Sequence, residues 1–95
     1  MDTKPEEFKS NAWVVYIIQS EFNKLYTGIT NDLERRFNEH LNSQKKKARF
    51  FHFSKPDKIV FCESHSNRSE ASKRECAIKK MSRKEKIALI EKGKT

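Results

Sequence analysis

The sequence predicts a small α+β domain with its strands and helices in the order β-β-α-β-α-α. Three observations lead to this fold class. Two β-branched and aromatic runs follow one another across a short turn. An apolar stripe with helical spacing comes next, and helix-capping patterns follow a third strand-like run. A chain of 95 residues makes one domain with a thin core, so a ligand must bind in a shallow cleft or on the surface.

The first two predicted strands form a hairpin. Residues 12–18 and 25–30 are rich in the side chains that favour strands. The turn at residues 20–23 is so short that the strands must be antiparallel. If residue 16 pairs with residue 26, Tyr16 and Tyr26 lie on one face of the sheet, and a shift by one residue would separate them.

The first predicted helix begins after Asn31 or Asp32, each of which is a good N-cap. Leu33, Phe37 and Leu41 then recur every four residues and form one apolar stripe. The helix therefore follows directly from the second strand.

Arg36 and His40 flank this stripe, whereas Arg35 points into solvent, because successive residues are about 100° apart around a helix. Residues four apart on one face can reach the same ligand. A guanidinium suits a phosphate because it donates two parallel hydrogen bonds. The alternatives are an ion pair from Arg36 to Glu39 or Glu75, and simple packing of His40.

The second half of the chain supplies the third strand and two more helices. A turn at residues 56–57 precedes a strand at residues 59–63. A second helix runs from a cap at residues 67–69 to about residue 81. Ser82-Arg83-Lys84-Glu85 is a capping box that opens a third helix, and Gly93 ends it.

The charge of the chain favours a polyanionic partner. There are 21 basic and 13 acidic residues, which gives a net charge of +8. Nucleic acid is the first candidate, an acidic membrane surface is the second, and lysines that only confer solubility are the alternative. The run at residues 45–53 combines cations with phenylalanines, as single-strand binders do, although these rings also suit a core. The predicted nucleic-acid-binding residues are Lys24, Arg35, Lys45, Lys46, Lys47 and Arg49.

Other features argue against a membrane-spanning protein and against a secreted one. No apolar run approaches the 18 residues of a membrane span. Residues 1–10 are polar, lack a signal-peptide core and read as a flexible tail, so the domain is expected at residues 11–92. Two cysteines without a secretory signal indicate reduced thiols and a cytoplasmic location.

Glu75 lies on the side of the second helix that carries Ala71 and Ile78. A carboxylate there must be paired, hydrated or bound to a cation. A single carboxylate with water and phosphate oxygens suits Mg²⁺, which keeps much of its hydration shell. The alternatives are an ion pair without a catalytic role and a side chain that reaches solvent at the helix edge.

The two tyrosines are candidate proton acceptors. A phenol has a pKa near 10, so it needs a nearby cation to ionise at neutral pH. Arg36, Lys24 or a bound metal would supply that charge. Packing in the sheet is the alternative role of both rings.

Taken together, these residues resemble the GIY-YIG nuclease family. Val14-Val15-Tyr16 stands where the family has Gly-Ile-Tyr, and Tyr26-Thr27-Gly28 stands where it has Tyr-Ile-Gly. Arg36, His40 and Glu75 follow in the family's order. The resemblance is greatest to small stand-alone members, which are similar to the nuclease domain of the bacterial excision-repair C subunit.

The resemblance implies a small three-stranded antiparallel sheet flanked by helices. It also implies hydrolysis of a DNA strand with one divalent metal, in repair or processing. It implies that Glu75 holds Mg²⁺ or Mn²⁺, that Arg36 steadies the charge of the reacting phosphate, and that Tyr26 or Tyr16 helps to deprotonate water. His40 would orient a tyrosine or the water. RNA stays open as a substrate, and a partner protein is expected to supply targeting. The rival interpretation is a catalytically weak or inactive nucleic-acid-binding module on the same fold.

Overall fold

The structure is a computed structural model that describes residues 12–93, so the predicted tail at residues 1–10 lies outside the described residues. The α+β fold class is confirmed. Strands β1 (Trp13–Ser20), β2 (Leu25–Thr30) and β3 (Pro56–His65) form one antiparallel sheet in the spatial order β2-β1-β3.

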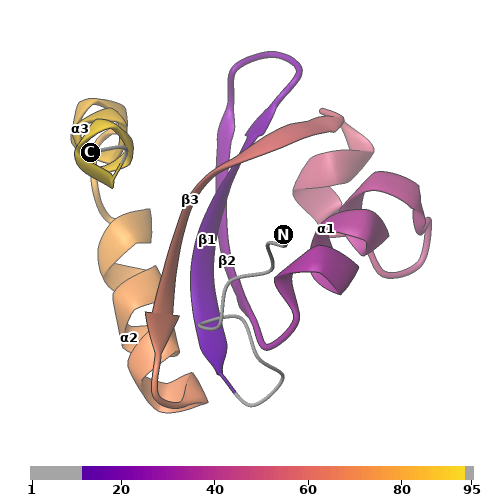
Figure 1. Cartoon of the computed structure of the whole chain (residues 1–95). Helices are drawn as coiled ribbons and strands as arrows, with labels where there is room; N and C mark the ends of the chain where they lie inside the picture. Colours follow the sequence, from indigo (N-terminus) through magenta and orange to yellow (C-terminus); the bar gives the residue numbers. More distant parts are fainter. Residues whose placement is uncertain (1–11, 94–95) are drawn as a thin grey trace, which may run out of the picture.

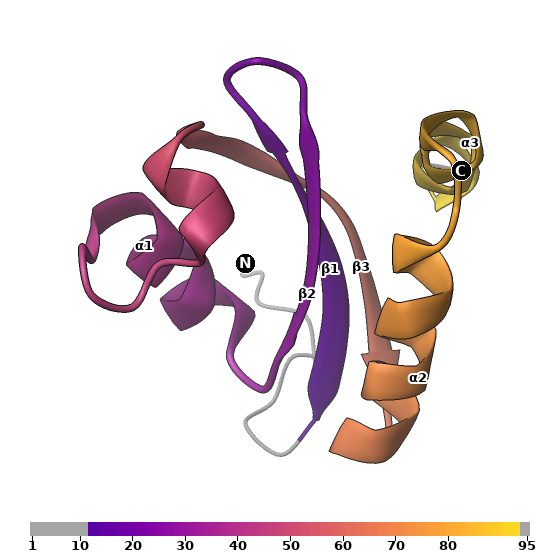
Figure 2. The ribbon, with the colours of Figure 1, turned by 180° about the vertical axis from the view of Figure 1, so that it is seen from behind.

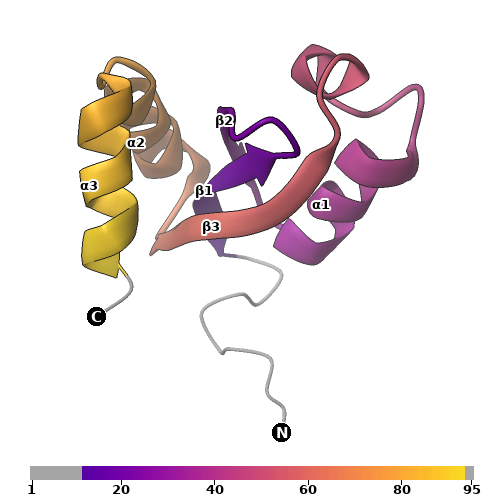
Figure 3. The same cartoon turned by 90° about the horizontal axis from the view of Figure 1, so that it is seen from above.

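Helices cover both faces of the sheet. Helix α1 (Leu33–Asn42) and a short 3₁₀ helix, η2 (Arg49–His52), lie against one face (Figures 1 and 3). Helices α2 (Arg68–Lys79) and α3 (Arg83–Gly93) lie against the other face, as the view from behind also shows (Figure 2). Within residues 12–93, no helix is both long and apolar enough to pass through a bilayer.

The alternation of side chains along β1 divides the core into two clusters. Val15 and Ile17 are buried and pack toward α2 and α3, with Ala71 and Ile78. Tyr16 and Ile18 are buried on the other face, in the cluster that includes Phe51. Because successive side chains of a strand point to opposite faces, one strand supplies both cores.

Side-chain hydrogen bonds decide the helix starts that the sequence left open. Asp32 caps α1, because its carboxylate accepts the backbone N–H of Arg35 at 3.1 Å. Asn67, rather than Ser69, caps α2 in the same way.

The capping box that opens α3 forms as predicted. The Glu85 backbone N–H donates to the Ser82 hydroxyl at 3.1 Å, and the Ser82 N–H donates to the Glu85 carboxylate at 2.8 Å.

The segment between α1 and β3 differs from the prediction. The strand begins at Pro56, where a turn was expected, and it continues to His65. Proline fits the first position of an edge strand because it has no N–H to donate. The 3₁₀ helix η2 was not predicted, since runs of four residues carry too weak a periodic signal.

Gly28 in β2 permits a close approach of two tyrosine rings. It pairs with Tyr16 across the ladder. A Cβ atom at position 28 would lie 2.5 Å from the Tyr16 hydroxyl, 2.7 Å from Cζ of the same ring and 3.1 Å from Tyr26. The Tyr16 ring therefore crosses β2 directly above Gly28, which explains the glycine without any unusual backbone angle.

We expect Gly28→Ala to lower the free energy of unfolding by about 1–3 kcal/mol, because the new methyl group overpacks the site. Urea denaturation measures this change. Gly93→Ala is the matched control, since its Cβ would lie no closer than 3.6 Å to Phe61. Equal stability of the two variants would contradict the close approach.

Candidate active site

Tyr16 and Tyr26 lie on the same face of the hairpin, the one covered by α1 and η2. Their ring centroids are 6.2 Å apart. Tyr16 pairs with Gly28, and Tyr26 pairs with Ile18, so the register differs by two residues from the pairing of 16 with 26 that the sequence suggested. A shift of two residues preserves the face, and for this reason the tyrosines still meet.

His40 holds the hydroxyl of Tyr16. Its Nε2 atom lies 2.9 Å from the Tyr16 oxygen, and its Nδ1 atom accepts the backbone N–H of Ala48 at 3.1 Å. Since Nδ1 is an acceptor, the single proton of the neutral ring is on Nε2 and is donated to Tyr16. Burial, with a smaller contribution from the charge of Arg36, lowers the pKa of His40 to about 4, so the ring is neutral at pH 7.

Arg36 is anchored on one side only. Its Nη1 donates to the Glu39 carboxylate and to the carbonyl of Lys46, each at 2.8 Å. A guanidinium has five N–H groups, so those on Nε and Nη2 remain for the phenol and a phosphate. Glu39 is one of the two ion-pair partners of Arg36 that the sequence suggested, the other being Glu75.

The adjacent arginines have different surroundings, as the helical spacing predicts. The Arg35 side chain is 54% exposed and pairs with Asp32 and Glu39. The Arg36 side chain is 26% exposed. Arg35 therefore belongs to the solvent-facing surface of α1.

The pKa of Tyr16 is raised well above its ordinary value. Burial is the main cause, and the neighbouring Tyr26 and the charge of Glu75 act in the same direction. The Arg36 guanidinium opposes them, through its charge and through hydrogen bonding to the phenol. Arg36, and not Lys24, is the cation beside this phenol: Lys24 is exposed at the end of the hairpin, where its N–H contacts Ser20.

Tyr26 is the more accessible phenol. It is half-buried, and its hydroxyl makes no hydrogen bond with any residue in the described range 12–93. Its ring is fixed by contacts with Phe51, His40 and Phe50, at centroid distances of 4.9, 5.4 and 5.5 Å. The ring is thus held rigidly while the oxygen stays available.

Glu75 approaches from the other layer. It lies between the buried Ala71 and Ile78 on the side of α2 that packs against the sheet, and its side chain is 19% exposed. Its partner is Lys79, at 3.1 Å, rather than Arg36. Glu75 nevertheless acts on the pKa of Tyr16, so the carboxylate and the phenol are within electrostatic reach of each other.

With Glu75 as the single carboxylate, this position suits only a cation that keeps most of its hydration shell. Among residues 12–93 there is no group of three or more His, Cys, Asp or Glu side chains arranged to hold a metal ion. One carboxylate suits Mg²⁺, which keeps several waters and binds substrate phosphates. It does not suit zinc, which needs at least three protein ligands.

Cations predicted to bind nucleic acid lie around this cluster. Lys45, Lys46 and Lys47 lie in the connection from α1 to η2, and Arg49 is the first residue of η2. The bonds from Arg36 to the Lys46 carbonyl and from the Ala48 N–H to His40 hold this basic connection against α1. The side chains of the candidate site therefore also position the cations.

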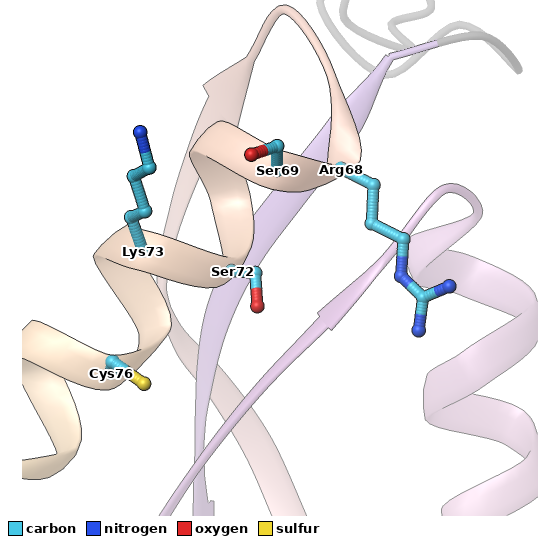
Figure 4. Close-up of a pocket in the computed structure, with 5 residues that line it drawn as sticks. All are labelled: Arg68, Ser69, Ser72, Lys73 and Cys76. Atoms are coloured by element: carbon cyan, nitrogen blue, oxygen red, sulfur yellow. The ribbon is translucent and has the colours of Figure 1, made fainter.

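A groove on α2 escaped the sequence analysis. It is lined by Arg68, Ser69, Ser72, Lys73 and Cys76 (Figure 4). Its two cations and two hydroxyls are all groups that contact phosphate, and Cys76 adjoins Glu75 in sequence. The available signal was the clustering of short polar side chains near the start of α2.

Residues 12–88 of this chain match the family model of the GIY-YIG catalytic domain. The chain belongs to the GIY-YIG family. The match confirms the family identified from the sequence.

The relatives within the GIY-YIG family are small UPF0213 proteins. One from Desulfotalea psychrophila is 48% identical over 79 residues, which cover 83% of this chain and 71% of the relative. One from Pseudomonas aeruginosa PAO1 is 40% identical, with 83% and 74% coverage. The solution structure of a UPF0213 protein from Bacillus halodurans is 30% identical, covers 86% of both chains and has a TM-score of 0.55.

The lowered pKa of His40 makes stability depend on pH. Between its ordinary value of 6.5 and about 4, the unfolded ring binds a proton that the folded ring does not. Stability therefore falls as the pH decreases through this window, by about 1.4 kcal/mol per pH unit where the difference is a full proton. We expect urea denaturation between pH 6.5 and 5 to show this slope, and His40→Gln to lose it. Equal slopes in both proteins would refute the assignment.

Proposed function

We propose that this protein is a divalent-metal-dependent endonuclease that hydrolyses a phosphodiester bond in DNA, in repair or processing. One arrangement carries the proposal: Tyr16 and Tyr26 share a face with ring centroids 6.2 Å apart, and Arg36 on α1 and Glu75 on α2 both lie near enough to affect the pKa of Tyr16. These groups come from opposite layers of the sheet. A cation-binding carboxylate, a phosphate-binding guanidinium and two phenols within reach of one another suit metal-assisted hydrolysis.

Tyr26 is the phenol best suited to take a proton from the attacking water. Its oxygen is accessible, whereas that of Tyr16 is buried and hydrogen-bonded to His40. Burial and the neighbouring Tyr26 both raise the pKa of Tyr16, so this phenol keeps its proton. Tyr16 and His40 then act as positioning residues that fix the face on which Tyr26 lies.

Arg36 stabilises the charge that builds up on the phosphate. Its remaining N–H groups are already oriented, because Nη1 is anchored to Glu39 and Lys46. Donors that are fixed before the reaction need no reorganisation, and this is the main source of electrostatic catalysis.

Glu75 would hold the divalent cation together with water and phosphate oxygens. When bound, Mg²⁺ or Mn²⁺ polarises the phosphate and lowers the pKa of water. In the absence of a cation, the Glu75 carboxylate pairs with the ammonium group of Lys79 at 3.1 Å.

The surrounding cations favour DNA binding through the phosphate backbone, and RNA would satisfy the same contacts. A partner protein that supplies targeting forms part of the proposal, as does a cytoplasmic location. The exposed thiol of Cys76, which forms no disulfide within residues 12–93, suits a reducing compartment.

A binding module without turnover is the second candidate. It is favoured by the Glu75–Lys79 ion pair, which occupies the carboxylate that a metal would need. Phosphate binding alone would use Arg36 and the basic connection equally well.

Glu75→Gln is expected to abolish nicking of supercoiled DNA, with a loss of at least about 100-fold, because the cation loses its protein ligand. Glu70→Gln is the matched control: it removes a carboxylate from the same helix that pairs with the exposed Lys73. The assay compares Mg²⁺, Mn²⁺ and EDTA. Nicking that survives Glu75→Gln would reject the active site, and salt-dependent binding without any nicking would favour the binding module.

Tyr26→Phe is expected to lower kcat more than Tyr16→Phe does, since only Tyr26 presents an accessible oxygen. Loss of a general base typically costs about 10²–10⁴-fold. Single-turnover cleavage of a labelled strand, with unfolding measured in parallel, separates this effect from destabilisation. If Tyr16→Phe lowered the rate of the chemical step more than Tyr26→Phe at equal stability, Tyr16 would be the proton acceptor and Tyr26 the positioning residue.

A further inference from the structure

Two phenylalanines remain outside the core and outside the candidate site. Phe22, at the tip of the β1–β2 hairpin, is 65% exposed, and Phe53, directly after η2, is 75% exposed. By contrast, Phe51 is buried in the core, and Phe50 packs on Tyr26. The basic aromatic run of the sequence therefore contains rings of two kinds, and only Phe53 presents its faces to solvent.

The loops that carry these two rings are tied together. The hydroxyls of Ser20 and Ser54 are 2.6 Å apart and buried. The Glu21 N–H donates to the carbonyl of Lys55 at 2.9 Å, and the Lys55 N–H donates to the Glu21 carboxylate at 3.1 Å. Phe22 follows Glu21 and Phe53 precedes Ser54, so the two rings emerge from adjoining, mutually fixed loops.

The segments that carry the pair are basic. Four basic side chains belong to the hairpin turn, η2 and the segment from Phe53 to the start of β3, against two acidic ones, and the Glu21 carboxylate already accepts a backbone N–H. The basic residues are Lys24, Arg49, Lys55 and Lys58, and the acidic residues are Glu21 and Asp57. An exposed aromatic pair in a basic setting is the arrangement that binds unpaired nucleotides, with phosphates on the cations and bases on the rings.

We propose that Phe22 and Phe53 form a stacking platform for unpaired bases of a DNA strand, so that the substrate combines single-stranded and duplex parts. The platform is attached to the strands of the candidate site: Phe22 is four residues from Tyr26, at most ~14 Å along the chain. This inference rests on the proposed nuclease function, whose substrate class it specifies.

The test measures binding in EDTA, so it needs no cutting. Fluorescence anisotropy compares a labelled single strand, the same strand with its central bases removed, and a duplex of equal length. We expect the intact strand to bind about fivefold to a hundredfold more tightly than the abasic strand, since each stacked base contributes a factor of that size. Phe22→Ala with Phe53→Ala should abolish this preference and leave duplex binding within about twofold.

Two controls separate the possible outcomes. Phe53→Trp keeps a stacking face and should retain the preference, with fluorescence quenched when the strand binds. Glu75→Gln should keep the preference for the intact over the abasic strand whatever its overall affinity, so loss of cutting and loss of stacking are read independently. Equal affinity of the wild type for intact and abasic strands would overturn the proposal. So would an equal loss of single-strand and duplex binding in the double variant, or a change of its oligomeric state in place of any change in binding.

Discussion

The space above Gly28 is the constraint on which the candidate site depends. Because this residue has no side chain, the Tyr16 ring crosses β2 and its hydroxyl reaches His40 from α1. The same crossing sets Tyr16 within the electrostatic influence of Glu75, which comes from the opposite layer. A Cβ atom at position 28 would clash with the Tyr16 ring, so the glycine is what permits the hydroxyl to take this position.

The two faces of β1 carry clusters of different character. Val15 and Ile17 pack with α2 and α3 in an apolar cluster. Tyr16 lies in a cluster of rings that is closed by hydrogen bonds from His40 to the hydroxyl and from Ala48 to His40. A buried polar network of this kind is tolerable only when its members are satisfied, and here each ring nitrogen of His40 has a partner.

The sequence predicted what depends on local patterns and missed what depends on contacts between distant segments. Caps, strands and the inward orientation of Arg36 follow from periods of two and 3.6 residues. The register of the hairpin does not follow from these periods, because registers that differ by two residues place both tyrosines on the same face. The Glu75–Lys79 pair, by contrast, has the i, i+4 spacing of a helical ion pair and could have been predicted from the sequence. The exposure of Phe22 and Phe53 depends on neighbours that no local pattern specifies. Proline at the start of β3 misled for the same reason, since a turn residue also suits an edge strand.

The bonding of the two charged site residues distinguishes binding from cutting. Arg36 uses only Nη1 to donate to Glu39 and Lys46, so its other N–H groups can bind a phosphate while these two hydrogen bonds remain. Glu75 pairs with Lys79 through Oε2, so a cation at this carboxylate would compete with the ammonium group, and its occupancy would depend on the cation concentration. In the proposed nuclease, the phosphate contacts would therefore be formed before the cation site. The proposed nuclease and the binding module would then differ in the replacement of a single ion pair.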